Sequence, residues 1–218
     1  MNPFLIQGGC LVAYSGAGMD VTIPEEVVEI GEGAFRDNRL IRAVHLGANI
    51  RTIGKSAFQG CTELSSVTGL SRVVDFQDEC FYGTGLEEVS LGRGVNNIGR
   101  SAFSCMPNLT TVNYYVEADL RLRYTFARCP KLETVNMERK CFAPFFCTYV
   151  AVLKNPQNKR PTFGDAFAGT PYIENTKKEY MDSYKKGICP DCGGKIKKGI
   201  FSSKCLGCGL YLKAAYWK

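Results

Sequence analysis

The chain has 218 residues, 45% of them apolar and 22% charged, which is ordinary for a globular protein with one good-sized domain and a smaller one. No run of 18 uncharged apolar residues occurs, so the sequence excludes a membrane-spanning helix. The net charge of +6 comes entirely from residues 174–218, which hold ten lysines against four acidic residues, whereas the preceding residues are neutral in sum.

The N-terminal residues do not combine a basic region with an apolar run, so we expect no secretory signal. Residues 4–6, 10–14 and 21–23 are apolar segments between glycine-rich turns, and we expect them to form short strands. These segments predict an N-terminal β cap over residues 1–22, because a stack of repeats needs an end element that covers its exposed core.

A phenylalanine preceded by a small residue then returns at an interval of 22 or 23 residues, and once after 41 residues. The series is Phe35, Phe58, Phe81, Phe103, Phe126 and Phe167. An apolar residue stands five positions before each of the first four, and a β-prone segment centred on valine follows each of the first five. Self-similarity at this period indicates a solenoid, in which stacked units share one core.

We therefore expect one short parallel strand in each repeat and a single buried file of phenylalanine rings. The strands should lie near residues 44–46, 67–69, 89–91, 112–114 and 135–137. Between Phe126 and Phe167 the period breaks, and there we expect two shortened coils with Phe146 in the phenylalanine position. A protruding loop is expected around residues 155–161.

Two repeats carry the pattern F-x-x-C-x-x-L-x-x-V, and this pattern resembles the BspA-like leucine-rich repeat family over roughly residues 20–170. The residues are Phe58, Cys61, Leu64, Val67, Phe126, Cys129, Leu132 and Val135. The resemblance implies an α/β leucine-rich repeat solenoid over residues 23–170, rich in β structure, with short parallel strands and short or irregular convex segments. It also implies a strand face that binds partners, but no enzymatic activity, because such scaffolds serve many kinds of recognition.

The residues on either side of each strand valine should point away from the core and form two rows. One row is Ala43, Ser66, Glu88, Thr111 and Thr134, and the other is His45, Thr68, Ser90, Asn113 and Asn136. This strip of small hydrogen-bonding side chains is the expected partner-binding face. The alternative is that they are simply solvated strand positions.

We expect no catalytic site on this face, although a histidine beside a hydroxyl and a carboxylate suggests one. Glu88 lies in a different row from His45 and Thr68, and an open sheet does not exclude water.

Residues 171–186 are expected to form a helix that covers the C-terminal end of the solenoid. Pro171 suits a first helical turn, and Gly187 suits the position after the last one. A helix lying on a membrane surface is the alternative, which the acidic residues of its polar face disfavour.

Two C-x-x-C pairs, separated by twelve residues, are formed by Cys189, Cys192, Cys205 and Cys208. This spacing predicts a four-thiolate metal site, and residues 187–218 resemble a zinc ribbon built on a hairpin. Four thiolates close the coordination shell, so the site should be structural. We expect Zn²⁺, with iron in a rubredoxin-like site as the alternative.

The remaining cysteines are seven in number and scattered over repeat positions, which argues against a disulfide framework. They are Cys10, Cys61, Cys80, Cys105, Cys129, Cys141 and Cys147. We expect buried free thiols and a reducing, cytoplasmic setting.

The sequence as a whole favours a non-enzymatic scaffold that binds a protein or peptide through the strand face. One alternative is a nucleic-acid-associated protein that binds through the lysine-rich ribbon. The other is surface adhesion or carbohydrate binding, which would require export. The sequence does not determine the oligomeric state.

Overall fold

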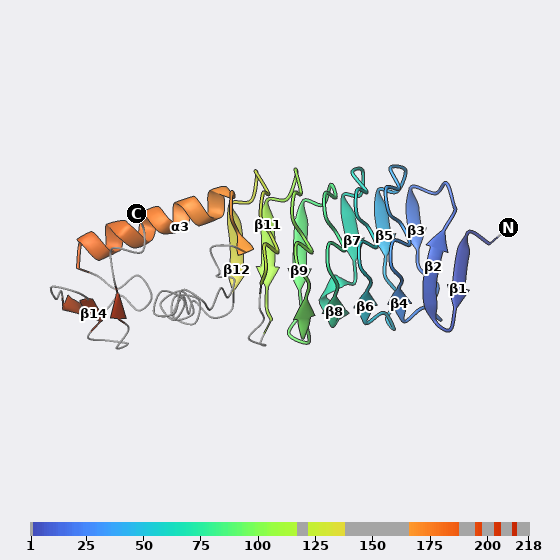
Figure 1. Cartoon of the computed structure of the whole chain (residues 1–218), viewed down its shortest axis with the longest axis horizontal. Helices are drawn as coiled ribbons and strands as arrows, with labels where there is room; N and C mark the ends of the chain where they lie inside the picture. The colour runs from blue at the N-terminus through green and yellow to red at the C-terminus, as the bar shows by residue number, and fades with distance from the viewer. Residues whose placement is uncertain are drawn as a thin grey trace, which may run out of the picture. The chain divides into compact units, whose positions relative to one another are not determined.

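The computed structural model describes residues 2–116, 122–137, 166–187, 195–197, 203–205 and 211–212. The chain divides into two compact units. The first comprises Met1–Glu138 and Arg160–Pro171, and the second comprises Arg139–Lys159 and Tyr172–Lys218. In the described residues the first unit is a β-solenoid, and the second contains a helix and a small antiparallel sheet (Figure 1).

The solenoid begins with the antiparallel hairpin of β1 (Phe4–Gln7) and β2 (Cys10–Tyr14). The next strand, β3 (Asp20–Thr22), lies close to its predicted position. β2 pairs in parallel with β4 (Glu29–Ile30), and β3 pairs in parallel with β5 (Ala43–His45). The N-terminal strands are therefore hydrogen-bonded directly to the first repeats.

One side of the solenoid is a sheet of six strands in the order β1-β2-β4-β6-β8-β10. Its later members are two-residue strands, β6 (Thr52–Ile53), β8 (Asp75–Phe76) and β10 (Asn97–Ile98). Each ends at the buried apolar residue that stands five positions before a phenylalanine. The glycine that often follows provides room, because a Cβ at Gly54 would lie 2.7 Å from the carbonyl oxygen of Ile30 in the preceding repeat.

The other side carries the predicted valine-centred strands, and their parallel pairing is confirmed (Figure 1). They are β5, β7 (Ser66–Thr68), β9 (Glu88–Leu91), β11 (Thr111–Tyr114) and β12 (Thr134–Met137). They form two sheets instead of one, β3-β5-β7 and β9-β11-β12. A short 3₁₀ helix, η1 (Leu70–Arg72), follows β7 at the break.

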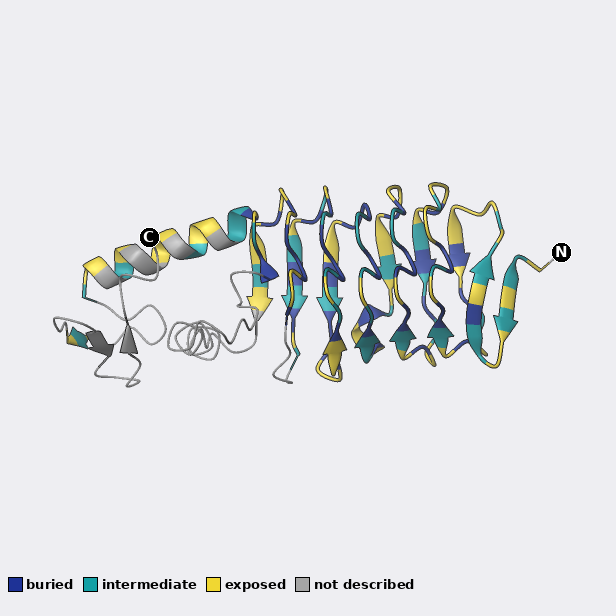
Figure 2. Cartoon of the chain, in the orientation of Figure 1, coloured by how far each residue is buried: buried dark blue, intermediate teal, exposed yellow. Residues whose placement is uncertain are grey.

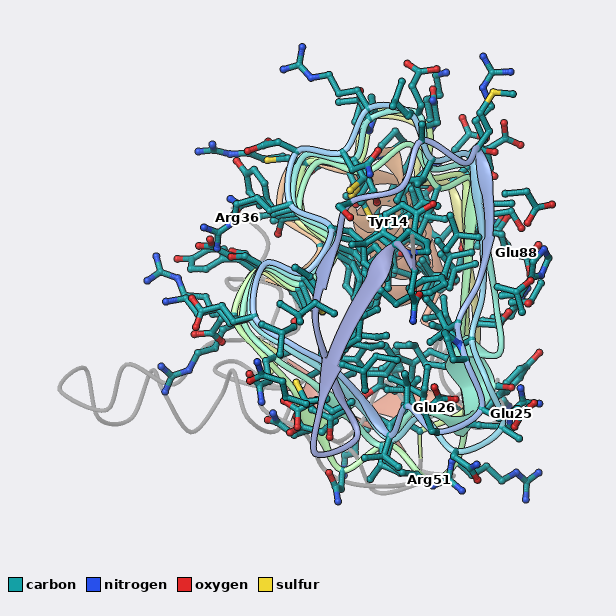
Figure 3. All side chains as sticks on the ribbon, turned by 90° about the vertical axis from the view of Figure 1, so that its right-hand side faces the viewer. Tyr14, Glu25, Glu26, Arg36, Arg51 and Glu88 are labelled. Atoms are coloured by element: carbon teal, nitrogen blue, oxygen red, sulfur yellow. The ribbon has the colours of Figure 1, made fainter. Side chains whose placement is uncertain are left out.

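The predicted file of phenylalanine rings is confirmed, and buried residues recur in every repeat (Figure 2). From Phe35 to Phe126 the ring centroids of neighbouring repeats lie 4.8 to 5.4 Å apart, with planes within 13° of parallel. Tyr14 extends the file at its N-terminal end, with its ring 5.0 Å from that of Phe35 (Figure 3). The rings form the shared core that no single repeat could bury alone.

The prediction of two shortened coils between Phe126 and Phe167 is wrong. The Phe167 ring stacks directly on that of Phe126, with centroids 5.2 Å apart and planes 13° apart. The Phe126 N–H donates to the carbonyl oxygen of Ala166 at 2.8 Å, as each earlier phenylalanine does to the residue before the next one. The extra residues are therefore an insertion within one repeat, and Phe146 lies outside the described residues.

The backbone turns through two left-handed corners in each regular repeat, two residues before and two residues after the phenylalanine. Around Phe81 the corners are Glu79, with φ of 58°, and Gly83, with φ of 70°. The corresponding residues of the other repeats are Gly33, Asp37, Ser56, Gly60, Ser101, Cys105, Tyr124 and Arg128. Because many corners lack glycine, they could not be predicted from the residue types.

In the second unit, the described residues form one helix and three short strands. The helix α3 (Pro171–Lys185) confirms the predicted helix, but its role as a cover for the solenoid stays a prediction. The strands β13 (Ile196–Lys197), β14 (Ser203–Cys205) and β15 (Tyr211–Leu212) form an antiparallel sheet in the order β13-β14-β15. The hairpin expected within residues 187–218 corresponds to the antiparallel pairing of β13 with β14.

The left-handed corners provide a matched test of the backbone geometry. Gly83→Ala should lower the free energy of unfolding by about 1 kcal/mol, because a side chain disfavours positive φ, although no atom obstructs a Cβ there. Gly94→Ala also enters open space but outside the left-handed region, so it should be neutral or stabilise by up to about 1 kcal/mol. Urea unfolding of both variants measures the difference, and equal effects would contradict the corner assignment.

Candidate partner-binding face

The strand face, as we use the term, consists of the outward-pointing residues of β3, β5, β7, β9, β11 and β12. In the first sheet, Asp20, Ala43 and Ser66 align in one row and Thr22, His45 and Thr68 in the other. In the second sheet the rows are Glu88, Thr111, Thr134 and Ser90, Asn113, Asn136. The structure thus aligns the predicted face residues within each sheet, while their role in binding stays a prediction.

Side chains of the second sheet are connected by hydrogen bonds across the strands. The Asn136 amide donates to Oδ1 of Asn113 at 2.8 Å, and the Asn113 amide donates to Oγ of Ser90 at 3.0 Å and to Oε1 of Glu88 at 2.6 Å. Ser90 Oγ also donates to Glu88 Oε1 at 3.2 Å. Glu88 points outward, on the other side of the solenoid from Arg36 (Figure 3). These bonds orient the polar groups before any partner arrives.

In the first sheet His45 lies between two polar partners. Its Nε2 is 2.9 Å from Oδ1 of Asp20, and its Nδ1 is 3.0 Å from Oγ1 of Thr68. The carboxylate beside the histidine thus comes from Asp20, which sequence reasoning missed because residues 21–23 were assigned to the cap. The alignment of Asp20-Val21-Thr22 with the next repeat would have identified it.

This trio is open to solvent, since the side chains of His45 and Asp20 are 43% and 70% exposed. Water therefore competes at every atom of the trio, and the arrangement is suited to hydrogen-bonded recognition.

The strand face is hollowed where its two sheets separate, between β7 and β9. The hollow, which we call the junction groove, has a volume of about 350 Å³. It is lined by Ser65, Ser66, Val67, Gly69, Leu70, Ser71, Glu87, Glu88 and Ser90. Sequence reasoning missed Ser65, Ser71 and Glu87 as members of the face.

A local exchange in the sequence coincides with the groove. After the strand valine, the neighbouring repeats continue with Leu46-Gly47 and Leu91-Gly92, whereas this repeat has Gly69-Leu70. Gly69 adopts φ of 91°. Leu70 is buried, and it belongs to η1 and not to the strand. β7 ends at Thr68, as β5 ends at the equivalent His45, but here η1 follows the strand. The reversed order of leucine and glycine was the signal available in the sequence.

The charges of the strand face are acidic or neutral. Its rows contain the carboxylates of Asp20 and Glu88 and the imidazole of His45, but neither lysine nor arginine. The junction groove adds Glu87 to this set. The face therefore suits an electropositive or hydrogen-bonding partner better than a polyanion.

Comparison with known families now identifies the repeats. Residues 14–133 match, in six copies, the BspA type leucine-rich repeat region. The chain belongs to this family. No curated protein matches the chain.

Solved structures of leucine-rich repeat proteins resemble this BspA-type chain. A leucine-rich repeat protein from Bacteroides ovatus is 23% identical, with a TM-score of 0.52 over 64% of this chain and 39% of that one. The T. pallidum leucine-rich repeat protein is 24% identical, with a TM-score of 0.48 over 60% of this chain and 75% of that one. A leucine-rich cell surface protein from Faecalibacterium prausnitzii is 17% identical, with a TM-score of 0.38 over 64% and 50%. The B. ovatus likeness supports the repeat fold alone.

The described cysteines of the first unit are free thiols, and three of them, Cys61, Cys80 and Cys129, are buried as predicted, whereas Cys10 and Cys105 are only half-buried. Cys61 Sγ donates to the carbonyl oxygen of Phe35 at 2.9 Å, and Cys129 Sγ donates to that of Phe103 at 3.4 Å. Burial raises the pKa of both thiols to about 12, so neither forms a thiolate near neutral pH. The other two predicted free thiols, Cys141 and Cys147, lie outside the described residues.

Of the four predicted metal ligands, Cys205 lies in β14, where its backbone is paired with Ile196. Cys189, Cys192 and Cys208 lie outside the described residues. Within the described part of the chain, no three His, Cys, Asp or Glu residues come together as a metal site. No helix in that part is long and apolar enough to cross a membrane.

The buried thiols predict a loss of stability in alkali. Cys61 and Cys129 should release their protons near the ordinary pKa of 9.0 when unfolded but only near 12 when folded. Their stabilisation is therefore complete below pH 9 and falls as the pH rises towards 12, by about 1.4 kcal/mol per pH unit for each thiol at most.

Urea unfolding under reducing conditions at pH 8, 9.5 and 10.5 measures this loss. The difference in unfolding free energy between the natural chain and Cys61→Ser should shrink as the pH rises. A difference that stays constant would show that the thiol is not protected from ionisation.

Proposed function

We propose that this BspA-type chain is a non-enzymatic scaffold that binds a protein or peptide partner through the strand face. The observation that carries the proposal is the alignment of outward polar side chains in two rows, with their hydrogen bonds already formed across β9, β11 and β12. Groups held in place lose less conformational freedom when a partner binds. Extended surfaces of this kind are how repeat proteins bind their partners.

The charge of the face favours a polypeptide over a nucleic acid. Binding to nucleic acid depends on clustered lysine and arginine, which the two rows lack. The buried free thiols support a reducing compartment such as the cytoplasm, which suits an intracellular partner better than a role in adhesion. Nucleic-acid binding and carbohydrate binding are therefore outcomes for the tests to detect.

We also propose that residues 187–218 form a ribbon around one structural Zn²⁺ held by Cys189, Cys192, Cys205 and Cys208. Four thiolates fit this ion, and Cys205 lies on β14, the central strand of the three-stranded antiparallel sheet β13-β14-β15. A bound zinc ion contributes about 10–16 kcal/mol to comparable small folds, which a segment this short needs.

A matched pair of substitutions tests the strand face. Peptides selected from a random display library on the intact chain provide the ligands. Asn113→Arg should weaken their binding about tenfold, because a long charged side chain would disrupt the hydrogen bonds to Glu88 and Ser90. Asn97→Arg makes the same change on β10, on the other side of the solenoid, and should alter binding less than twofold.

Titration calorimetry of both variants measures these effects at two salt concentrations. Equal losses in the two variants would exclude the strand face as the binding surface. Tight binding of a DNA or RNA oligonucleotide that falls steeply with added salt would favour the nucleic-acid alternative instead.

The zinc proposal is tested by elemental analysis of the purified chain. We expect about one zinc ion per chain, and less than half an ion in Cys192→Ser, because one of four ligands is lost. Cys105→Ser, which removes a free thiol of the solenoid, is the control and should leave the metal content unchanged. Iron in place of zinc, or a metal-free chain, would overturn the assignment.

A further inference from the structure

The junction groove lies at an interruption of the backbone hydrogen bonds. On one side of it Ser66 pairs with Ala43, and on the other side Glu88 pairs with Thr111. No backbone hydrogen bond joins β7 to β9 anywhere in residues 65–91, all of which the structure describes. The facing edges of these two strands are therefore not paired with each other.

The interruption is local, because the same two repeats approach closely at both of its ends. A Cβ at Gly85 would collide with the carbonyl oxygen of Thr62, and one at Gly92 would collide with that of Ser71. Between these points the repeats separate, and Val67 is partly exposed, whereas Val44 and Val89 are fully buried. The groove is thus a short slot with closed ends and an open outer side.

The lining of the slot is polar and acidic. Serine hydroxyls of β7, η1 and β9 surround it, together with the carboxylates of Glu87 and Glu88. Oε1 of Glu88 is held by Asn113 and Ser90, whereas the Glu87 carboxylate has no partner within the described residues. The guanidinium of Arg72 donates instead to the carbonyl oxygen of Leu46 at 3.4 Å. Among the described residues, neither lysine nor arginine lines the slot.

We propose that the junction groove selects the partner by receiving a lysine or arginine side chain from an extended peptide. The cation would pair with Glu87 and Glu88, and the serine hydroxyls would accept hydrogen bonds from its remaining N–H groups, while the peptide backbone stays outside the slot. A hollow of this volume accommodates one long side chain. The inference rests on the proposed function of the strand face.

The repeat architecture offers a matched control for Glu87. Glu133 occupies the same position relative to its strand valine, two residues before it, but stands where β11 and β12 are paired in register. Both glutamates are exposed, so neither substitution by glutamine should disturb the fold. Glu87→Gln removes a carboxylate from the groove, whereas Glu133→Gln removes one from a part of the strand face where the strands are paired.

The experiment selects random twelve-residue peptides from a display library on the intact chain and on both variants. On the natural chain we expect lysine or arginine to be enriched about fivefold at one fixed position. The enrichment should disappear on Glu87→Gln and persist on Glu133→Gln. In titrations, replacing that basic residue by norleucine should weaken binding to the natural chain about fivefold but leave binding to Glu87→Gln unchanged.

The outcomes separate the groove from the face. If the selected peptides show no preferred basic residue but Asn113→Arg still weakens their binding about tenfold, the groove proposal is overturned and the proposed function stays intact. If Glu87→Gln and Glu133→Gln weaken peptide binding equally, the effect comes from the overall charge of the chain. That result would also overturn the groove proposal. If no peptide binds the chain, both the groove proposal and the proposed function fail. Both also fail if the selected peptides show no preference for a basic residue and Asn113→Arg does not weaken their binding.

Discussion

Stacking of one aromatic ring on the next sets the spacing of the entire solenoid. Ring centroids 4.8 to 5.4 Å apart match the distance of 4.7–4.9 Å at which parallel strands form hydrogen bonds, so ring packing and backbone pairing are satisfied by the same rise per repeat. Each ring is buried only because the repeats above and below supply its two faces. The small residue before each phenylalanine and the glycine after the apolar strand residue follow from the same close approach.

Because the core is fixed by a few inward positions, the outward positions are free to carry recognition chemistry. The hydrogen-bonded rows of the strand face use that freedom without disturbing the stack. At the junction groove the strand pairing is interrupted next to an exchange of leucine and glycine, while the rings of Phe58 and Phe81 remain stacked at 4.9 Å. The outward side of one repeat can therefore differ from that of its neighbours without disturbing the core.

The interval of the phenylalanines was enough to predict the buried file, the valine-centred strands and the two outward rows, because a repeated apolar pattern has only one way to share a core. The insertion after β12 was misinterpreted, since counting residues along the chain cannot distinguish a longer loop from an additional coil. Tyr14 was missed because a different aromatic residue begins the file at a shorter interval. The place of Asp20 beside His45 and the junction groove both depend on how strands of neighbouring repeats pair. The sequence of one repeat does not contain that information.

The direct contact between Phe126 and Phe167 has a consequence for protein engineering. The chain leaves the stack after one repeat and resumes in register at the next, so continuity of the polypeptide and continuity of the core are separate properties here. The number of residues between Met137 and Ala166 is therefore not fixed by the stack, which makes this part of the sequence a suitable position for an engineered insertion.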